Sequence, residues 1–205
     1  MKKALMALAL TVSTTAFAEI PAFQLSAGVG ALLDLGFAKA DRAGQEYYSR
    51  STVGFGSYGF LDATFAELDI SYYAGTSKMT LRRVYSEDKG RFNALNIGLL
   101  GKFPFDLGRV TLFPLMGIDY QVTLSFIDGS RLNYTDATEY FSALWFKFGA
   151  GMDIDVTEKT YFRAELLYGL RLRNKLEKEL AGESPQVTMG LGHGPAIRLA
   201  AGYKF

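Results

Sequence analysis

The final segment of this chain limits its fold more than any other feature. It reads GPAIRLAAGYKF, in which Ile197, Leu199 and Phe205 belong to one apolar row, while Arg198 and Lys204 belong to the intervening row. Alternation with a period of two is typical of a β-strand whose two faces meet different surroundings. The segment therefore predicts a strand with one apolar face and one charged face.

The same alternation recurs along most of the chain. The clearest example is the apolar row that runs from Val110 to Phe126, which is interleaved with Thr111, Asp119 and other polar residues. Residues 52–61 are rich in glycine and aromatic residues. The parity of this segment, meaning which of its residues share a face, is unclear. We expect eight strands at about 23–37, 52–61, 64–74, 92–103, 110–126, 140–156, 161–173 and 194–205.

The expected connections alternate in length. The long, polar ones lie near 38–51, 75–91, 127–139 and 174–193. The short ones lie near 62–63, 104–109 and 157–160. Long loops on one side and tight turns on the other are typical of outer-membrane barrels with periplasmic turns. The sequence predicts an all-β fold, namely an eight-stranded antiparallel up-and-down transmembrane β-barrel with four long outer loops and short periplasmic turns.

Alternation alone leaves open which face points outward. A soluble, lipocalin-like barrel would turn the charged row to water and the apolar row to a ligand cavity. Three observations favour the membrane arrangement. The charged row is also the glycine row, which suits a crowded lumen. Strands of about eleven residues suit a tilted bilayer crossing. Aromatic residues gather at the two expected interfaces.

These aromatic residues form two groups. Near the expected periplasmic end lie Phe23, Phe103, Phe105, Tyr161, Phe162, Tyr203 and Phe205. Near the expected outer end lie Tyr47, Tyr48, Tyr72, Tyr73, Tyr85, Tyr134 and Tyr140.

The N-terminal segment predicts export. Residues 1–18 contain two lysines, a short apolar run and small residues that end at Ala18, which is typical of a secretory signal peptide. The apolar run is too short to cross a bilayer as a helix. We predict cleavage after Ala18 and a single barrel domain over residues 19–205.

Composition excludes several classes of protein. A formal net charge of +1 gives no basis for nucleic-acid binding. After the signal there is no apolar run long enough for a transmembrane helix, and the chain has no cysteine, so it has no disulfide. Twenty-two glycines and abundant aromatic residues suit strands and turns rather than disorder.

If the charged row points inward, the lumen contains seven acids and seven bases. They are Asp34, Glu67, Asp69, Asp119, Asp153, Asp155, Glu165, Lys102, Lys147, Arg163, Arg171, Arg173, Arg198 and Lys204. Unpaired charge in a narrow lumen is costly, so we expect a balanced charge network that closes the barrel. A polar conduit is the alternative. Trp145 has inward parity and either blocks the outer half or turns to the lipid at a bulge.

The terminal strand also carries a resemblance. Its alternating apolar residues, Tyr203 at the third position from the end and the final Phe205 resemble the assembly signal of bacterial outer-membrane barrels. As a pattern, residues 19–205 resemble the small outer-membrane β-barrel family, in the manner of OmpA-type transmembrane domains, OmpX and OmpW. The resemblance implies the bacterial outer membrane, its lipid and lipopolysaccharide, and the barrel-assembly machinery as partners. It carries over no catalytic or binding residue.

Three functions follow as alternatives. The first is a non-enzymatic barrel that acts in surface structure, adhesion or host interaction through ligands at its outer loops. The second is a narrow, OmpW-like channel for small or apolar solutes. The third is an enzyme that modifies lipopolysaccharide acyl chains, which needs a histidine base beside a serine. The single histidine, His193, lies in LGHGPA with no serine two residues on. We therefore expect no catalysis, no cofactor and no metal.

Overall fold

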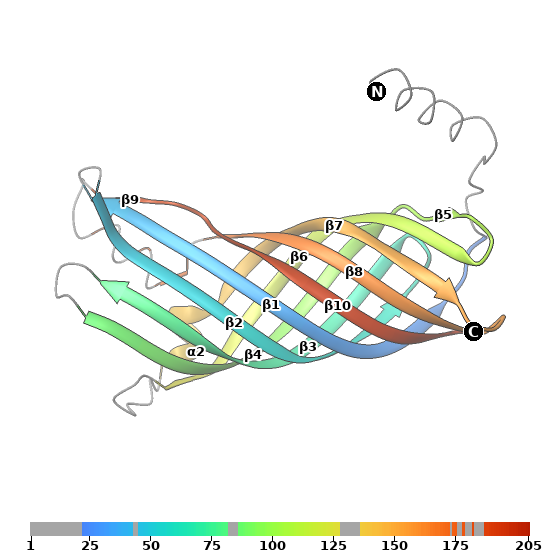
Figure 1. Ribbon diagram of the computed structural model, residues 1–205, viewed down its shortest axis with the longest axis horizontal. Helices are drawn as coiled ribbons and strands as arrows, with labels where there is room; N and C mark the ends of the chain where they lie inside the picture. Colours follow the sequence, from blue (N-terminus) through green and yellow to red (C-terminus); the bar gives the residue numbers. More distant parts are fainter. Residues whose placement is uncertain are drawn as a thin grey trace, which may run out of the picture.

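The computed structural model describes residues 22–42, 45–81, 86–127, 136–172, 174–175, 178, 182 and 187–205. Within them, nearly all residues belong to one antiparallel sheet (Figure 1). The predicted signal peptide, its cleavage site, Tyr85 and Tyr134 lie outside the described residues. No helix in the described part of the chain is long and apolar enough to cross a membrane.

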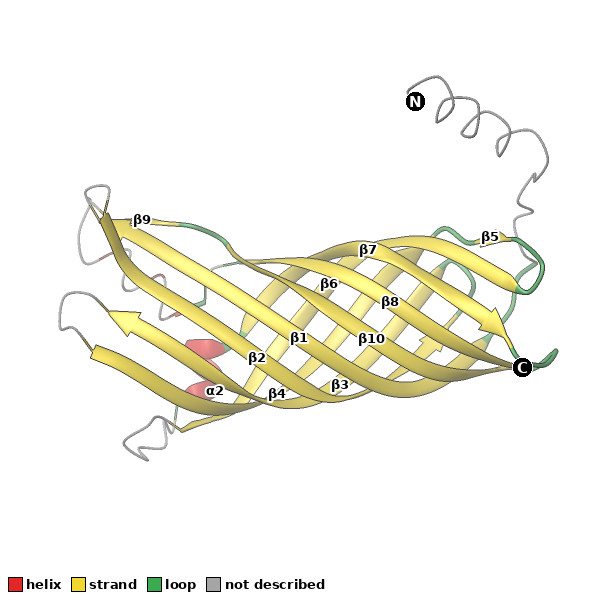
Figure 2. Cartoon of the chain, viewed as in Figure 1, coloured by secondary structure: helices red, strands yellow, loops and turns green. Residues whose placement is uncertain are grey.

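Eight long strands and two short ones make up the sheet (Figure 2). The long strands are β1 (Ser26–Arg42), β2 (Gln45–Asp62), β3 (Ala66–Leu81), β4 (Ser86–Lys102), β6 (Val110–Ile127), β7 (Ala143–Asp155), β8 (Thr160–Arg171) and β10 (Gly192–Lys204). The short ones are β5 (Phe105–Asp106) and β9 (Val187–Met189), and one short helix, α2, spans Ala137–Phe141.

The sheet closes on itself. Each long strand pairs with its neighbour in chain order, and β1 also pairs with β10 from Ser26 opposite Lys204 to Phe37 opposite His193. The strands are visibly tilted around the common axis (Figure 1). Closure pairs both edges of the sheet, as only a barrel does. The predicted eight-stranded antiparallel fold is confirmed.

Large apolar side chains cover the outside of the barrel. Phe55, Leu61, Leu166 and Leu199 are all more than half exposed, while charged side chains on the opposite face are buried. Such a broad exposed apolar surface belongs against lipid rather than water. This orientation excludes the soluble, inverted barrel that the alternation alone had left open.

The first two expected loops are mostly strand. Residues expected as the connections 38–51 and 75–91 continue the ladders, with Ala40 opposite Tyr48 and Lys78 opposite Lys89. Their inward positions are small or aromatic, apart from residues such as Arg50, so the alternation does not stop where polar residues begin. The two hairpins therefore reach farther than the ends of β7 and β8 (Figure 1).

A bulge changes the parity of β6. Asn93 pairs with Ser125, but the next residue, Ala94, pairs with Thr123, so Leu124 is an extra residue in the ladder. Phe126 consequently points inward and is buried, although the uninterrupted alternation had placed it on the lipid side.

Four tyrosines expected at the membrane interfaces are also inside. Tyr161 at the periplasmic end and Tyr47, Tyr48 and Tyr73 toward the outer end are almost fully buried. Exposed aromatic residues do remain at the periplasmic end, where Tyr203 and Phe205 pack edge to face at 5.6 Å between centroids. Parity, rather than residue type, places Tyr48, Tyr73 and Tyr161 inside, and Tyr47 is the extra residue where the register of the β1–β2 ladder shifts.

Inward aromatic rings explain why glycine shares the charged face. The Phe113 ring lies over Gly151 on the neighbouring strand, and a Cβ added there would be 2.3 Å from the ring. The Tyr161 ring lies over Gly202 in the same way, at 2.2 Å. Glycine on one strand thus makes room for the ring of the next, and the ring fills the lumen.

Candidate functional site in the lumen

The structure describes thirteen of the fourteen charged residues expected in the lumen. Those that are buried are Asp34, Glu67, Asp69, Lys102, Asp119, Lys147, Asp153, Arg163, Glu165, Arg171 and Arg198. Asp155 and Lys204 are half-buried at the periplasmic end, and Arg173 lies outside the described residues. These positions come from seven strands, whose alternation directs each side chain to the same interior.

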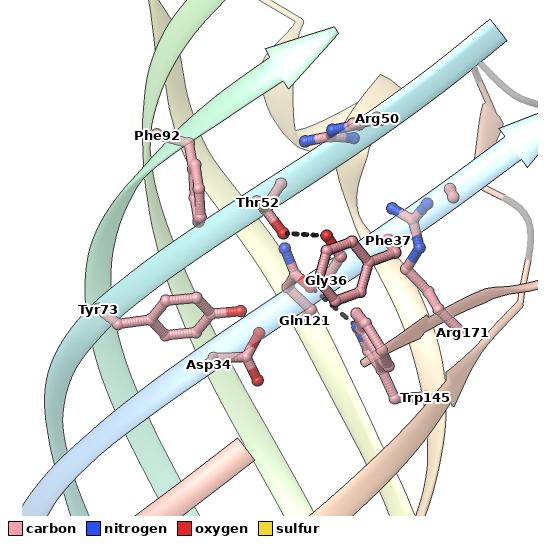
Figure 3. A pocket seen from close by; sticks show the side chains of 11 residues that line it. Asp34, Gly36, Phe37, Arg50, Thr52, Tyr73, Phe92, Gln121, Trp145 and Arg171 are labelled. Carbon is pink, nitrogen blue, oxygen red and sulfur yellow. Dashed lines mark hydrogen bonds between the residues drawn. The ribbon is translucent and has the colours of Figure 1, made fainter. Parts of the chain in front are cut away.

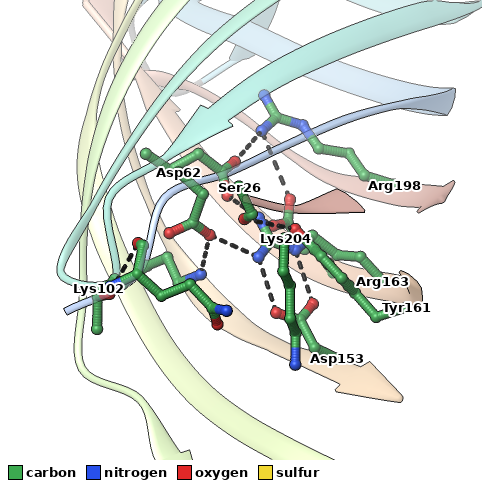
Figure 4. A network of polar contacts seen from close by, with 12 residues as sticks. Ser26, Asp62, Lys102, Asp153, Tyr161, Arg163, Arg198 and Lys204 are labelled. Atoms are coloured by element: carbon green, nitrogen blue, oxygen red, sulfur yellow. Dashed lines mark hydrogen bonds and ion pairs between the residues drawn. The ribbon is translucent and has the colours of Figure 1, made fainter. Parts of the chain in front are cut away.

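Arg163 on β8 joins three strands in the periplasmic half of the lumen (Figure 4). Its Nε donates to Asp153 Oδ1 at 2.7 Å and its Nη2 to Asp62 Oδ2 at 2.5 Å. Its Nη1 donates to Glu67, and Lys102 donates to the same Asp62 oxygen. A planar guanidinium can bind several carboxylates at once, which a single ammonium group cannot do with this geometry.

Arg198 on β10 forms a second centre next to the first. Its Nη2 donates to Asp69 Oδ1 at 2.9 Å. The same guanidinium lies 3.6–3.7 Å from oxygens of Glu165, Glu67 and Asp119. The sequence predicts these residues on one face, and the structure brings them together. We call Arg163, Arg198 and the carboxylates around them the arginine cluster.

Aromatic rings line the arginine cluster. The guanidinium carbon of Arg163 lies 4.2 Å from the centroid of the Phe60 ring, and that of Arg198 lies 5.1 Å from the Tyr58 ring. Cation–π contacts of this kind strengthen in a dry interior. The rings and ion pairs together fill the narrow section of the barrel.

Sequence reasoning missed two charged residues of the lumen. Asp62 was assigned to a turn because the parity of its strand was unclear, and Arg50 was assigned to a loop. The structure buries Asp62 among the bases just described and buries Arg50 in the outer half. Extending the even-numbered face of β2, which carries Tyr58 and Phe60 inward, would have found both.

A small chamber occupies the outer half of the lumen. Its volume is about 20 Å³, room for about one water molecule. Asp34, Tyr73, Gln121, Trp145 and Arg171 are among its lining residues (Figure 3). Trp145 points inward and its Nε1 donates to Gln121 Oε1 at 2.9 Å, so no bulge turns it to the lipid.

Aromatic packing fills the lumen above this chamber. The Phe141 ring at the end of α2 stacks on Phe126 of β6, with centroids 4.5 Å apart. The guanidinium of Arg50 lies 5.0 Å from the Phe141 centroid, and Phe92 belongs to the same buried cluster. We call Phe92, Phe126, Phe141 and Arg50 the aromatic seal.

The periplasmic end holds a second small cavity. It measures about 60 Å³ and is lined by Ser26, Lys102, Tyr161 and Arg163 among others. Ser26 and Tyr161 share a hydrogen bond between their hydroxyl groups at 2.8 Å. Lys204 donates to both oxygens of Asp155 at 2.7 Å beside this cavity. The arginine cluster separates this cavity from the outer chamber.

His193 lies on the outside of the barrel. Its Nδ1 shares a hydrogen bond of 2.8 Å with the Tyr168 hydroxyl, and its ring packs against Phe37 at 5.8 Å between centroids. These contacts are those of an interfacial aromatic residue. Within the described residues, no group of three or more His, Cys, Asp or Glu side chains could hold a metal ion.

Comparison with known proteins gives one family match. The model described as "Outer membrane protein beta-barrel domain" matches residues 4–205. No curated protein sequence matches the chain.

Several solved structures are similar at low identity. Ail, the attachment invasion locus protein of Yersinia pestis, solved with the heparin analogue sucrose octasulfate, is 15% identical with a TM-score of 0.44, covering 90% of this chain and 100% of its own. Neisserial surface protein A is 12% identical with a TM-score of 0.48, covering 86% and 97%. The outer membrane protease OmpT of Escherichia coli is 8% identical with a TM-score of 0.42, covering 92% and 100%. These likenesses are too distant to indicate a function.

Proposed function

This chain belongs to the family of outer membrane protein β-barrel domains, and from that premise we propose that it is a non-enzymatic, non-conducting barrel that acts at the cell surface. The barrel serves as a rigid support, and its outward-projecting part takes part in surface structure, adhesion or host interaction. The proposal that the barrel does not conduct rests on the closed lumen. The proposal that it acts at the cell surface rests on the hairpins that project beyond the lumen.

Two different obstructions support a lumen that conducts no ions. The arginine cluster joins β2, β3, β7, β8 and β10 across the periplasmic half through Arg163 and Arg198. The aromatic seal fills the outer half, and the cavities beside these two obstructions measure only about 20 and 60 Å³. Moving an ion through would require breaking several buried ion pairs at once, which is costly.

The projecting hairpins support a surface role. Because β1 pairs with β2 as far as Arg42 opposite Gln45, and β3 with β4 as far as Leu81 opposite Ser86, the described outer segments are ordered ladders. A preformed surface loses little conformational entropy when it binds a partner. Host molecules and lipopolysaccharide are the partners this surface would meet in an outer membrane.

Export and insertion complete the proposal. We propose that residues 1–18 are a signal peptide removed after Ala18. The exposed Tyr203 and Phe205, at the end of the strand that closes the barrel, form the signal read by the barrel-assembly machinery.

Single-channel recording tests the closed lumen. The protein is extracted from outer membranes, shown to be folded by its β-sheet circular dichroism, and inserted into a planar bilayer beside a porin as positive control. We expect no discrete conductance steps above the bare membrane. Reproducible steps whose size changes in Lys147→Gln would overturn the proposal and favour the narrow channel.

A further inference from the structure

The helix α2 is attached to the barrel through side chains rather than through a strand ladder. The ladder between β6 and β7 ends at Gln121 opposite Ala143, and Thr123 lies beyond it. The backbone N–H of Thr123 donates to Ser142 Oγ at 3.1 Å, and its carbonyl oxygen accepts from Thr138 Oγ1 at 2.9 Å. A helix of five residues has little stability of its own, so α2 depends on such contacts to stay in place.

The remaining contacts of α2 are also made by side chains. Lys175 pairs with Glu139, and its ammonium nitrogen lies 4.7 Å from the centroid of the Tyr140 ring. The side chains of that ion pair are 40% and 59% exposed, and exposed pairs contribute little to stability. Ala137 and Phe141 face inward and are buried. These contacts can open without breaking any strand pairing of the described barrel, which is typical of a segment that opens locally.

The Phe141 ring occupies a slot that adjoins the outer chamber. Its centroid lies 4.5 Å from that of Phe126 and 5.0 Å from the guanidinium carbon of Arg50. Arg50 and Phe92 belong to the aromatic seal and also line the chamber (Figure 3). Withdrawal of Phe141 would therefore join its slot to the chamber in one pocket. A slot between an aromatic ring and a guanidinium group suits another flat ring.

Asp34 gives the chamber a buried negative charge. Its side chain is 9% exposed, lines the chamber, and makes no hydrogen bond or ion pair with another residue that the structure describes. The charges of Lys147 and Arg198 act on it, but Lys147 donates to Asp119 and Arg198 donates to Asp69. A buried carboxylate without a hydrogen-bond donor is costly, so the chamber favours a group that is cationic and donates hydrogen bonds.

The two bases that line the chamber lie over aromatic rings. The guanidinium carbon of Arg171 is 5.8 Å from the Trp145 ring, and that of Arg50 is 5.8 Å from the Phe126 ring. The chamber itself, at about 20 Å³, has room for about one water molecule. An ammonium group is close to that size, whereas a carboxylate has two oxygens to accommodate. Size therefore favours an amine over an acid.

We propose that the outer half of the barrel is a binding pocket for a small aromatic amine, and that α2 is its lid. The ring of the ligand takes the place of Phe141 against Phe126, and its ammonium group donates to Asp34 in the chamber. The arginine cluster stays intact beneath the pocket, so binding requires no passage through the lumen. The pocket thus adds a ligand to the barrel and does not depend on its proposed surface role.

Titration calorimetry of the folded full chain in detergent tests this pocket. The fluorescence of Trp145, which lines the chamber, provides a second signal. The probe is phenethylamine, compared with phenylacetate, which carries the opposite charge, and with ethylamine, which lacks the ring. We expect phenethylamine to bind one to one, and the other two to bind at least about tenfold more weakly, because each lacks one of the two contacts.

Two substitutions should change the affinity for phenethylamine in opposite directions. Asp34→Asn keeps the shape of the side chain and removes its charge, so we expect affinity to fall about tenfold. Asp34 has no ion pair to lose, so this variant should fold as the native chain does. Phe141→Ala removes the ring that the ligand must displace. We expect affinity to rise about tenfold, because the closed lid no longer competes.

The matched controls lie outside the pocket. Glu158→Gln removes a carboxylate from an exposed periplasmic turn, and Phe146→Ala removes an exposed ring from the lipid-facing side of β7. Both should bind phenethylamine with native affinity.

Three results would each overturn the pocket. They are equal affinity of Asp34→Asn and the native chain, tighter binding of phenylacetate than of phenethylamine, and no gain in Phe141→Ala. Failure of both the native chain and Phe141→Ala to bind would also overturn it. A chain that conducts ions but binds phenethylamine in this way would refute the closed lumen and leave the pocket standing.

Discussion

The two halves of the lumen are filled by different interactions. The periplasmic half is filled by the arginine cluster, in which Arg163 alone contacts Asp62, Glu67 and Asp153. The outer half is filled by the aromatic seal, in which Phe141 stacks on Phe126. One half depends on matched charges, and the other depends on the shape of apolar groups.

This difference predicts different responses to substitution. A buried ion pair that loses one partner leaves an uncompensated charge, so the cost is large and cannot be relieved by small shifts. An aromatic cluster that loses one ring loses only contact area and stacking, so the cost follows the size of the change. Single substitutions in the charged half should therefore lower the free energy of unfolding sharply. In the aromatic half, the loss should scale with the size of the substitution.

Arg163→Met should have the largest effect. It leaves Asp62, Glu67 and Asp153 without their shared counter-ion, so we expect the free energy of unfolding to fall by about 3–5 kcal/mol. Unfolding in urea, followed by the fluorescence of Trp145, the chain's one tryptophan, measures this loss.

The matched control for Arg163→Met is Lys204→Met, which breaks the half-buried pair with Asp155. That pair meets solvent, so we expect a loss of at most about 1 kcal/mol. Equal losses in the two variants would show that the buried ion pairs of the arginine cluster contribute no more to stability than a half-buried pair does.

Gly151→Ala should have an intermediate effect. It tests how much the stability of the charged half depends on the aromatic rings within it. The new methyl group would meet the Phe113 ring, which is buried beside Lys102 and Arg163. We expect a loss of about 1–3 kcal/mol from overpacking, measured by the same unfolding curves.

Two variants accompany Gly151→Ala. At Gly101, an added Cβ is 3.6 Å from the nearest atom, so Gly101→Ala should be close to neutral. Adding Phe113→Leu to Gly151→Ala should recover part of the loss, and no recovery would mean that the backbone rather than the ring is obstructed.

Phe141→Leu should have the smallest effect of the three. Leucine keeps apolar volume in the aromatic seal and loses the stacking on Phe126 and the contact with Arg50. We expect a loss of about 0.5–1.5 kcal/mol. A loss as large as that of Arg163→Met would contradict the proposed difference between the halves.

Most of the fold was predictable from the sequence because one physical rule governs it. A period of two, applied from β1 to β10, assigns inner and outer faces as the structure has them for residues such as Asp69, Arg163 and Arg198. The pairing of particular acids with particular bases was not predictable, because it depends on the stagger between strands that are distant in sequence.

The errors arose where that rule is interrupted or continues past its expected end. The extra residue Leu124 reverses the parity of β6, and no turn residue marks it, so Phe126 was assigned to the lipid face. Because the hairpins contain polar residues, they were predicted as loops, and Tyr48 and Arg50 were not assigned to the inward face. α2 is a single turn without a helical repeat long enough to detect.

The pairing of β1 with β10 makes the barrel's completion a late event. The strand that closes the sheet comes from the far end of the chain, so this contact carries the largest loop-closure entropy of any in the molecule. Until it forms, both outer strands present unpaired backbone groups that invite association with other chains. A cell that makes this protein must therefore protect an unfinished sheet during its whole passage, and interrupting the last strand would expose two edges at once.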